Sequence, residues 1–124
     1  MSKAQFLAEN LKPGETYAGL ILGEKGQPDY HLILLPGEQK SINWEDAQKW
    51  AESVGGVIPD IRESCLLLAN CKEHFEPALY WTRDQYVHGD AYAWTQNFVY
   101  GGQSLNRKSS HYRARAVRRI FIIE

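Results

Sequence analysis

Two runs of apolar and β-favouring residues mark the first part of the chain. They cover residues 17–22 and 30–35 and flank residues 23–29, which contain Gly, Pro and Asp. Such runs on either side of a turn-rich segment are typical of a β-hairpin. A short helix over residues 4–10 precedes the hairpin, and a Pro-Gly pair ends its second strand. We therefore expect a hairpin close to the start of the fold.

Apolar residues then recur at helical spacing. Their positions in the first such segment are Trp44, Ala47, Ala51 and Val54. These side chains share one helical face, with Asn43 as the N-cap and a Gly-Gly pair after the last turn. Asp60 and Glu63 form a second capping pattern, ahead of residues 66–71, which are apolar almost all round. The pattern predicts one amphipathic helix and then one that is largely buried.

Short strands are predicted for the last third of the chain. Two of them cover residues 79–82 and 91–98, and a long final strand starts near Tyr112. Residues 101–110 are polar and are predicted to form a loop. The alternation of the final strand breaks at Val117-Arg118, which a β-bulge near there would explain. A hairpin, two helices and three strands in this order predict an α+β fold.

Length and composition fit one globular domain. The chain has 124 residues, of which 44% are hydrophobic and 23% charged, close to the averages of globular domains. No apolar stretch approaches the roughly 20 residues of a transmembrane helix, and the first residues lack the apolar core of a secretory signal. We expect one domain over residues 1–124, with no signal peptide for secretion and no membrane partner.

The two cysteines point to a reducing compartment. Cys65 and Cys71 lie in one predicted helix, and their spacing separates them by roughly 9 Å along the helix axis. A disulfide between them would require a break in that helix. We expect both to be reduced residues of the core.

Charges are divided unevenly along the chain. All acids except Glu124 lie in the first 90 residues. The acid-free segment 91–123 carries six bases: Arg107, Lys108, Arg113, Arg115, Arg118 and Arg119. Two interpretations stay open, because these bases either pair with acids of the first part or form a patch for nucleic acid or another polyanion. The candidates for such a patch are Arg107, Lys108, Arg113, Arg115 and Arg119.

A series of short motifs resembles a known family. In chain order they are Trp44-x-x-Ala47, Gly55-Gly56-Val57-Ile58-Pro59, Tyr80-Trp81-Thr82, Tyr92-Ala93-Trp94, Gly101-Gly102-Gln103 and Tyr112-Arg113-Ala114-Arg115. Together they resemble the Lcl C-terminal domain family, a domain of largely unknown function in bacteria and in their phages and prophages. Residues 17–22 and 31–38 are similar to a short phage and prophage branch of it.

The resemblance covers residues 15–120 and leaves residues 1–14 as a short lead. It implies a C-type-lectin-like fold, with two helices packed on a small, mostly antiparallel sheet and a long polar loop region. It also implies a phage or prophage setting, so we expect the protein in the host cytoplasm or on the virion. Ile58-Pro59-Asp60-Ile61-Arg62 and Thr82-Arg83-Asp84 depart from the usual family pattern.

The calcium site of lectins with this fold has no clear counterpart in the sequence. Calcium needs six to eight oxygen ligands, usually with several carboxylates. Gln27-Pro28-Asp29 resembles the galactose-type tripeptide of such lectins but lies in the hairpin turn. Where lectins carry Trp-Asn-Asp, this chain has Trp94-Thr95-Gln96. We therefore expect no metal and no other cofactor.

No catalytic constellation stands out either. The four histidines are spread along the chain: His31, His74, His88 and His111. Neither cysteine lies beside a basic segment that would activate its thiol. Formylglycine-generating enzymes share the implied fold, but their cysteine-containing centre has no counterpart here. We expect a protein that is not an enzyme.

Aromatic residues point instead to binding. Trp44, Trp81 and Trp94 resemble core positions of the family. Residues 83–90 and 97–111 combine Tyr and Arg with small polar residues, a composition typical of binding loops. The candidate ligand-binding residues are Arg83, Tyr86, Tyr92, Tyr100, Gln103, Asn106, Arg107 and His111. The alternative is that these segments are merely solvated loops.

Three functional hypotheses follow from the sequence. The leading one is a calcium-independent binding module that recognises a host or phage protein, or less readily a glycan, through these loops. The second is nucleic-acid or other polyanion binding through the C-terminal arginines, which predicts a steep loss of affinity with salt. The third is a structural homo-oligomer in which the loops of two copies meet.

Overall fold

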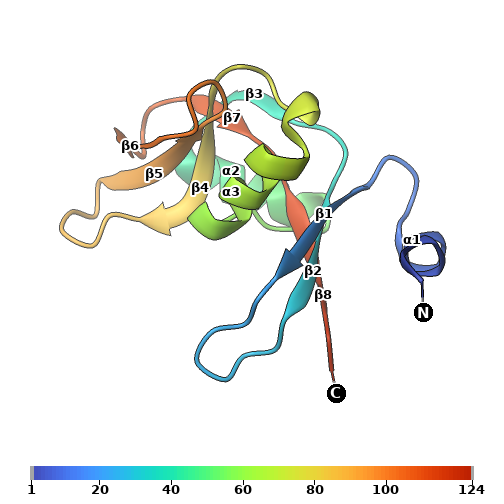
Figure 1. Cartoon of the computed structure of the whole chain (residues 1–124). Helices are drawn as coiled ribbons and strands as arrows, with labels where there is room; N and C mark the ends of the chain where they lie inside the picture. The colour runs from blue at the N-terminus through green and yellow to red at the C-terminus, as the bar shows by residue number, and fades with distance from the viewer. Residues whose placement is uncertain (1, 124) are drawn as a thin grey trace.

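Two β-sheets and three α-helices form the α+β fold of this chain, seen in a computed structural model that describes residues 2–123 (Figure 1). The first sheet has the order β1-β2-β8, with β1 (Thr16–Ile21), β2 (Tyr30–Leu34) and β8 (Val117–Phe121). The second has the order β3-β7-β4-β5-β6, with β3 (Gln39–Ile42), β7 (Tyr112–Ala114), β4 (Leu79–Gln85), β5 (Tyr92–Asn97) and β6 (Gln103–Arg107). The helices are α1 (Lys3–Asn10), α2 (Trp44–Ser53) and α3 (Ile61–Asn70), and the short 3₁₀ helix η1 (Lys72–His74) follows α3.

Both predicted helix starts are confirmed by their caps. The Asn43 side chain accepts a hydrogen bond from the Asp46 backbone N–H at 2.9 Å and begins α2. At α3, Asp60 and Glu63 form a complete capping box, in which each side chain accepts from the backbone N–H of the other. These bonds satisfy N–H groups that the first helical turn leaves without partners.

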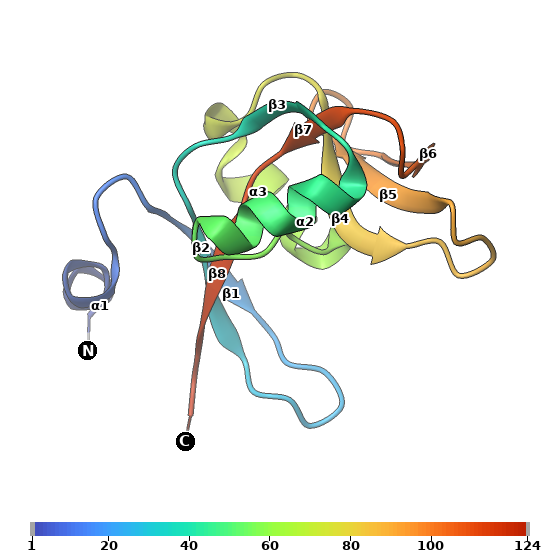
Figure 2. The same cartoon turned by 180° about the vertical axis from the view of Figure 1, so that it is seen from behind.

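Helices α2 and α3 cover opposite faces of the five-stranded sheet. Helix α3 lies in front of it in Figure 1 and α2 lies in front in the reverse view of Figure 2. The α2 side is a core of Trp and Ala side chains: Trp44, Ala47, Ala51, Trp81, Ala93, Ala114 and Ala116. On the α3 side, Leu67 and Cys71 pack with Tyr80 and with Leu32 and Leu34 of the first sheet. Helix α3 therefore packs against both sheets.

The N-terminal helix α1 is attached more lightly. None of its residues is buried, and Figure 1 shows it to one side of β1. Its Phe6 ring lies 4.1 Å from the His31 ring, and the Asn10 carbonyl accepts from Arg118 at 2.7 Å. These few contacts hold the predicted lead segment on the outer face of the first sheet.

The final strand differs from its prediction. It divides into β7 and β8, which belong to different sheets, and β8 pairs with β2 in regular register through Val117. A β-bulge at Val117 is therefore wrong, because the break lies at residues 115–116. Ala116 faces the core under α2, whereas Val117 faces the core under α3. Because successive residues of an extended chain point to opposite faces, both are buried where both faces are covered, and the apolar–polar alternation of the sequence stops there.

Two further strands escaped the sequence patterns. Residues 101–110 are not simply a loop, because Gln103–Arg107 forms β6 and pairs with β5 without a register shift. Strand β3 pairs with β7 at the other edge of the sheet. Both are edge strands with mostly polar residues, so neither shows the apolar alternation that identifies a half-buried strand.

Helix α3 is less buried than predicted. Leu67 and Cys71 are buried, but Cys65 is exposed, so the expectation that both cysteines lie in the core is wrong for Cys65. The helix buries Glu63 and Ser64 instead. Trp94 was also expected in the core and is only half-buried. Among residues 2–123, no helix combines the length and the apolar character needed to cross a membrane.

The close approach of α2 to β8 requires a glycine after α2. A Cβ atom at Gly56 would lie 2.4 Å from the Val117 carbonyl oxygen and 2.8 Å from Leu35 Cδ1. We predict that Gly56→Ala lowers the free energy of unfolding by about 1–3 kcal/mol, the usual cost of overpacking a well-packed site. Urea denaturation measures this loss. Gly102→Ala is the matched control, because nothing lies within 4 Å of its added Cβ, and an equal loss in both variants would contradict the steric explanation.

Candidate functional site

The predicted ligand residue Arg83 lies in an internal ion cluster. At its centre is the carboxylate of Glu63, which is fully buried. Arg83 on β4 donates to Glu63 at 3.0 Å and to Asp60 at 3.2 Å. Arg119 on β8 donates to both oxygens of Glu63, at 2.7 and 3.0 Å. The Tyr30 hydroxyl donates a further bond at 2.7 Å.

These bonds keep Glu63 ionised. Burial alone would raise the pKa of its carboxyl group, but the hydrogen bonds from Arg119, the Asp60 backbone and Tyr30 and the charge of Arg83 outweigh it and hold the pKa below its ordinary value. At Asp60 burial prevails and raises the pKa. The cluster therefore engages both guanidinium groups in bonds within the fold, while 30% of the Arg83 side chain and 23% of the Arg119 side chain remain exposed.

Three other arginines, two on strands β7 and β8 and one between them, are also held by the fold. Arg118 donates to both oxygens of Glu15, at 2.7 and 2.9 Å, and Arg113 pairs with Glu38. Arg115 donates to the backbone carbonyls of His74 and Leu35. Three members of the proposed polyanion patch are therefore bonded within the fold: Arg113 and Arg119 to carboxylates and Arg115 to backbone carbonyls.

The Glu38 carboxylate also organises a tyrosine. It accepts a hydrogen bond from the Tyr80 hydroxyl at 2.8 Å, on the oxygen that Arg113 does not use. Burial and this carboxylate raise the pKa of Tyr80 to about 12, so its hydroxyl stays protonated and continues to donate. Strands β4 and β7 are thereby tied to the segment that leads into β3.

Five side chains form a continuous patch at the end of the β4-β5-β6 sheet, which we call the aromatic surface. Its members are Tyr86, Tyr92, Trp94, Leu105 and Arg107. Tyr92 and Trp94 alternate along β5, and their register partners on β6 are Arg107 and Leu105, so these four share one face. All are half-buried except Arg107, which is exposed.

Ring contacts order the aromatic surface. The guanidinium of Arg107 lies 5.3 Å from the centre of the Tyr92 ring, within the range of a cation–π interaction. The Tyr86 ring meets the Trp94 ring edge to face at 6.4 Å. Gly89 lies between the tyrosines, because a Cβ atom there would come within 3.6 Å of both rings. The rings are therefore positioned by paired strands and by each other.

The remaining candidate residues lie elsewhere. Tyr100 is 90% exposed in the turn between β5 and β6, at the other end of the hairpin from Tyr92. Gln103 donates to the buried Gln96 at 2.8 Å. Asn106 points to the opposite face, where it bonds Thr95 and Tyr112, and His111 is exposed just before β7. Of the predicted ligand residues, the structure brings together Tyr86, Tyr92 and Arg107.

Lys108 extends towards α2, on the other side of the sheet from the aromatic surface. Its ammonium group donates to Gln85 at 2.7 Å and lies 4.5 Å from the centre of the Trp44 ring. Sequence reasoning missed two members of the surface, Trp94 and Leu105. The period-two spacing from Tyr92 would have placed Trp94 on the same face, whereas Leu105 gave no signal because the segment around it reads as a polar loop.

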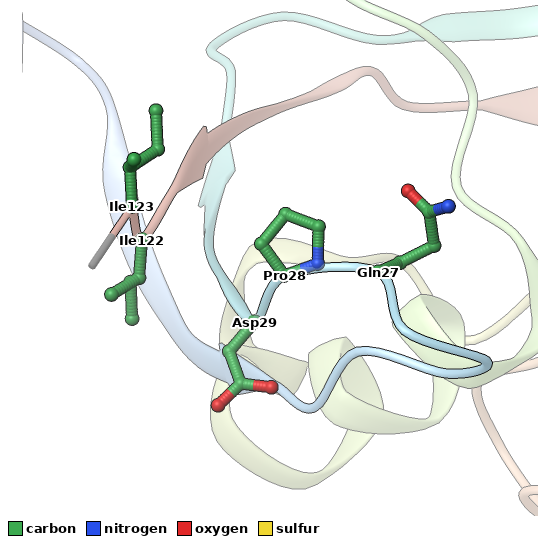
Figure 3. Close-up of a pocket in the computed structure, with 5 residues that line it drawn as sticks. All are labelled: Gln27, Pro28, Asp29, Ile122 and Ile123. Atoms are coloured by element: carbon green, nitrogen blue, oxygen red, sulfur yellow. The ribbon is translucent and has the colours of Figure 1, made fainter.

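The Gln-Pro-Asp tripeptide has a structural role. The Asp29 carboxylate accepts a hydrogen bond from the Gly23 backbone N–H at 2.7 Å and closes the hairpin turn. Together with Ile122 and Ile123 the tripeptide lines an open pocket of about 460 Å³ (Figure 3). Figure 3 shows the Gln27 and Asp29 side chains pointing in different directions. Across residues 2–123, no three His, Cys, Asp or Glu side chains are grouped as ligands for a metal ion.

Comparison with known proteins adds no assignment. No family model matches the chain, and no curated protein is significantly similar to it. The resemblance to the Lcl C-terminal domain family stays a prediction, carried by the motifs in the sequence.

The buried Glu63 predicts a specific loss of stability. Glu63→Gln leaves the Arg83 and Arg119 charges without their shared carboxylate, so the free energy of unfolding should fall by about 3–5 kcal/mol at neutral pH. Because the pKa of Glu63 is below its ordinary value of 4.5 in the folded protein, its contribution is full above that pH and is lost as the pH falls further. The difference between the two proteins should therefore shrink in acid.

Denaturant unfolding at a series of pH values measures both effects. Glu73→Gln is the matched control, because the Glu73 side chain is 69% exposed. Equal stabilities of Glu63→Gln and the control at neutral pH would contradict the central place of Glu63.

Proposed function

We propose that this chain is a non-enzymatic binding module of phage or prophage type that recognises a protein through the aromatic surface. The observation that carries the proposal is the ordered group of three aromatic rings and one arginine at the end of a sheet. Tyr, Trp and Arg are the residues that most often dominate the binding energy of protein interfaces. Their rings give contact area at a low cost in conformational entropy.

The rigidity of the aromatic surface supports a protein partner. Tyr92, Trp94, Leu105 and Arg107 lie on paired strands rather than on free loops. Tyr86 follows β4 directly and donates its backbone N–H to the Tyr92 carbonyl at 3.0 Å. A surface that is ordered before binding loses less entropy when it meets its partner. Val87, which is largely exposed next to Tyr86, extends the apolar area.

A C-type-lectin-like fold of the Lcl type forms part of the same proposal. It is supported by the order of elements, with a hairpin, two helices and a sheet that closes the chain, and by β1 and β8 lying on either side of β2 in one sheet. In this setting the partner is a host or phage protein met in the host cytoplasm or on the virion. Recognition is calcium-independent, because Asp29 is committed to the hairpin turn and residues 91–123 contain no acid.

Polyanion binding is the weaker candidate. Arg113, Arg115 and Arg119 are engaged by carboxylates or backbone carbonyls of the fold. Only Arg107 and Lys108 of that set remain at the surface, and both lie over aromatic rings. Such an arrangement supports contact with a protein better than a stripe of phosphate contacts.

A capture experiment tests the proposal. The immobilised chain is incubated with lysate of a bacterial host, bound proteins are identified, and the affinity of the purified partner is then measured. Tyr86→Ala/Tyr92→Ala should weaken binding at least tenfold, since each buried aromatic contact at the centre of an interface contributes about 1 kcal/mol or more. The control is Glu45→Ala/Lys49→Ala, which changes two exposed residues of α2 on the other face of the sheet.

The outcomes separate the candidates. Equal affinity of the aromatic double variant and the wild type would contradict the proposed surface. Capture of nucleic acid, with an affinity that falls steeply with salt and is unchanged in the double variant, would favour the polyanion hypothesis.

A further inference from the structure

Strand β8 has an open edge. One edge pairs with β2. Two backbone hydrogen bonds mark the ends of this ladder: Leu35 N donates to the Ala116 carbonyl, and Ile122 N donates to the Asp29 carbonyl. In an antiparallel ladder, alternate residues point their backbone groups to opposite sides. The backbone groups of Val117, Arg119 and Phe121 therefore point away from β2. Ile123 lies two residues beyond the end of β8.

Only the first of these positions is occupied. Val117 exchanges two backbone hydrogen bonds with Val57, at 2.8 and 2.9 Å. Within residues 2–123, no hydrogen bond reaches the backbone groups of Arg119 or Phe121. Beyond Val57 the edge can accept another strand.

The side chains at this edge are apolar and exposed. Phe121 is 50% exposed and Ile123 is 87% exposed. Natural sheets protect their edges with charges, prolines, bulges or a covering element. Arg119 is the charged residue at this edge, and its guanidinium is bound to Glu63 inside the molecule. An open apolar edge of this kind is a site for pairing with another strand.

We propose that the occupant of this edge is β8 of a second copy of the chain, paired antiparallel about a two-fold axis at Phe121. A two-fold dimer uses the same patch on both subunits, so the strand must complement itself. In this register Phe121 faces Phe121 of the second copy, and Arg119 faces Ile123 of the second copy. Arg119 and Phe121 direct their free backbone groups towards the partner.

Other registers fit less well. An axis at Arg119 places two arginines directly opposite each other, which is destabilising. An axis at Ile120 places Ile123 of the second copy opposite Val117, where Val57 already occupies the edge. The axis at Phe121 avoids both conflicts and leaves the Arg119–Glu63 ion pair intact.

The side chains of this register are complementary on both faces of the joined sheet. On one face the two Phe121 rings meet. On the other face Ile120 meets Ile122 of the second copy, and the symmetric contact repeats it. Two hollows flank β8 and give these side chains room, one of about 210 Å³ beside Tyr30 with a mixed lining and a mostly apolar one of about 280 Å³ beside Val57.

Dimerisation through β8 would leave the aromatic surface free. That surface belongs mainly to β5 and β6 in the second sheet, whereas β8 lies in the first (Figure 1). The dimer would present two aromatic surfaces, and a partner with two sites would bind it with increased avidity. This consequence rests on the proposed function, but dimerisation itself does not.

The test uses opposite charges at the symmetric position. Phe121→Lys and Phe121→Glu each place like charges across the two-fold axis, so each variant alone should associate at least tenfold more weakly than the wild type. An equimolar mixture should regain association, because Lys and Glu then face each other. Sedimentation velocity over a roughly hundredfold range of concentration measures the monomer–dimer equilibrium. Thermal unfolding checks that both variants remain folded. Val87→Lys is the control, because Val87 is an exposed apolar residue between β4 and β5 and does not belong to the first sheet.

Each result decides the proposal. A wild type that dimerises, two monomeric variants and a mixture that dimerises would support the register at Phe121. A wild type that is monomeric at every concentration would overturn the proposal. Dimerisation that persists in both variants, or that Val87→Lys abolishes, would place the contact on another surface and overturn it too. None of these outcomes depends on whether a partner binds the aromatic surface.

Discussion

The buried carboxylate of Glu63 connects parts of the fold that no strand pairing joins. Arg119 comes from β8 and Tyr30 from β2 in the first sheet, whereas Arg83 comes from β4 in the second. Glu63 itself belongs to the first turn of α3 and closes the capping box with Asp60. One ionised group thus fixes the start of a helix and the relative position of two sheets. The desolvation of such a group is costly unless it is fully paired and hydrogen-bonded, so all of these elements must be in place together.

This constraint explains how the charge of the chain is used. Three of the five arginines in the acid-free last third meet acids supplied by the first two thirds, so a sequence that looks divided in charge is partly balanced on folding. Arg107 stays exposed and lies over the Tyr92 ring of the aromatic surface. The aromatic surface lies on the sheet that Glu63 fixes through Arg83, and the open edge of β8 belongs to the strand that Glu63 fixes through Arg119. Both proposed contacts of the molecule therefore depend on the same buried group.

The sequence predicted elements where a single local rule applied. The hairpin and the capped starts of α2 and α3 follow from alternation, helical spacing and cap residues, and all are present. It failed where tertiary contacts decide: β3 and β6 are polar edge strands, and the final strand divides into β7 and β8, which belong to different sheets. For the site, composition identified Tyr86, Tyr92 and Arg107. It also selected Arg83, because no sequence pattern shows that the Arg83 charge pairs with Glu63, 20 residues earlier in the chain. The family resemblance predicts Trp94 in the core, but the side chain is only half-buried.

A double-mutant cycle on Arg83 and Arg119 tests most directly whether one carboxylate joins the two sheets. The free energy of unfolding is measured for the wild type, Arg83→Gln, Arg119→Gln and the double variant. Either single substitution leaves Glu63 with one cation, whereas both together leave it buried with none. The double variant should therefore lose more unfolding free energy than the sum of the two single losses, by about 1 kcal/mol or more. Losses that add to within about 0.5 kcal/mol, as for independent sites, would contradict the central role of Glu63.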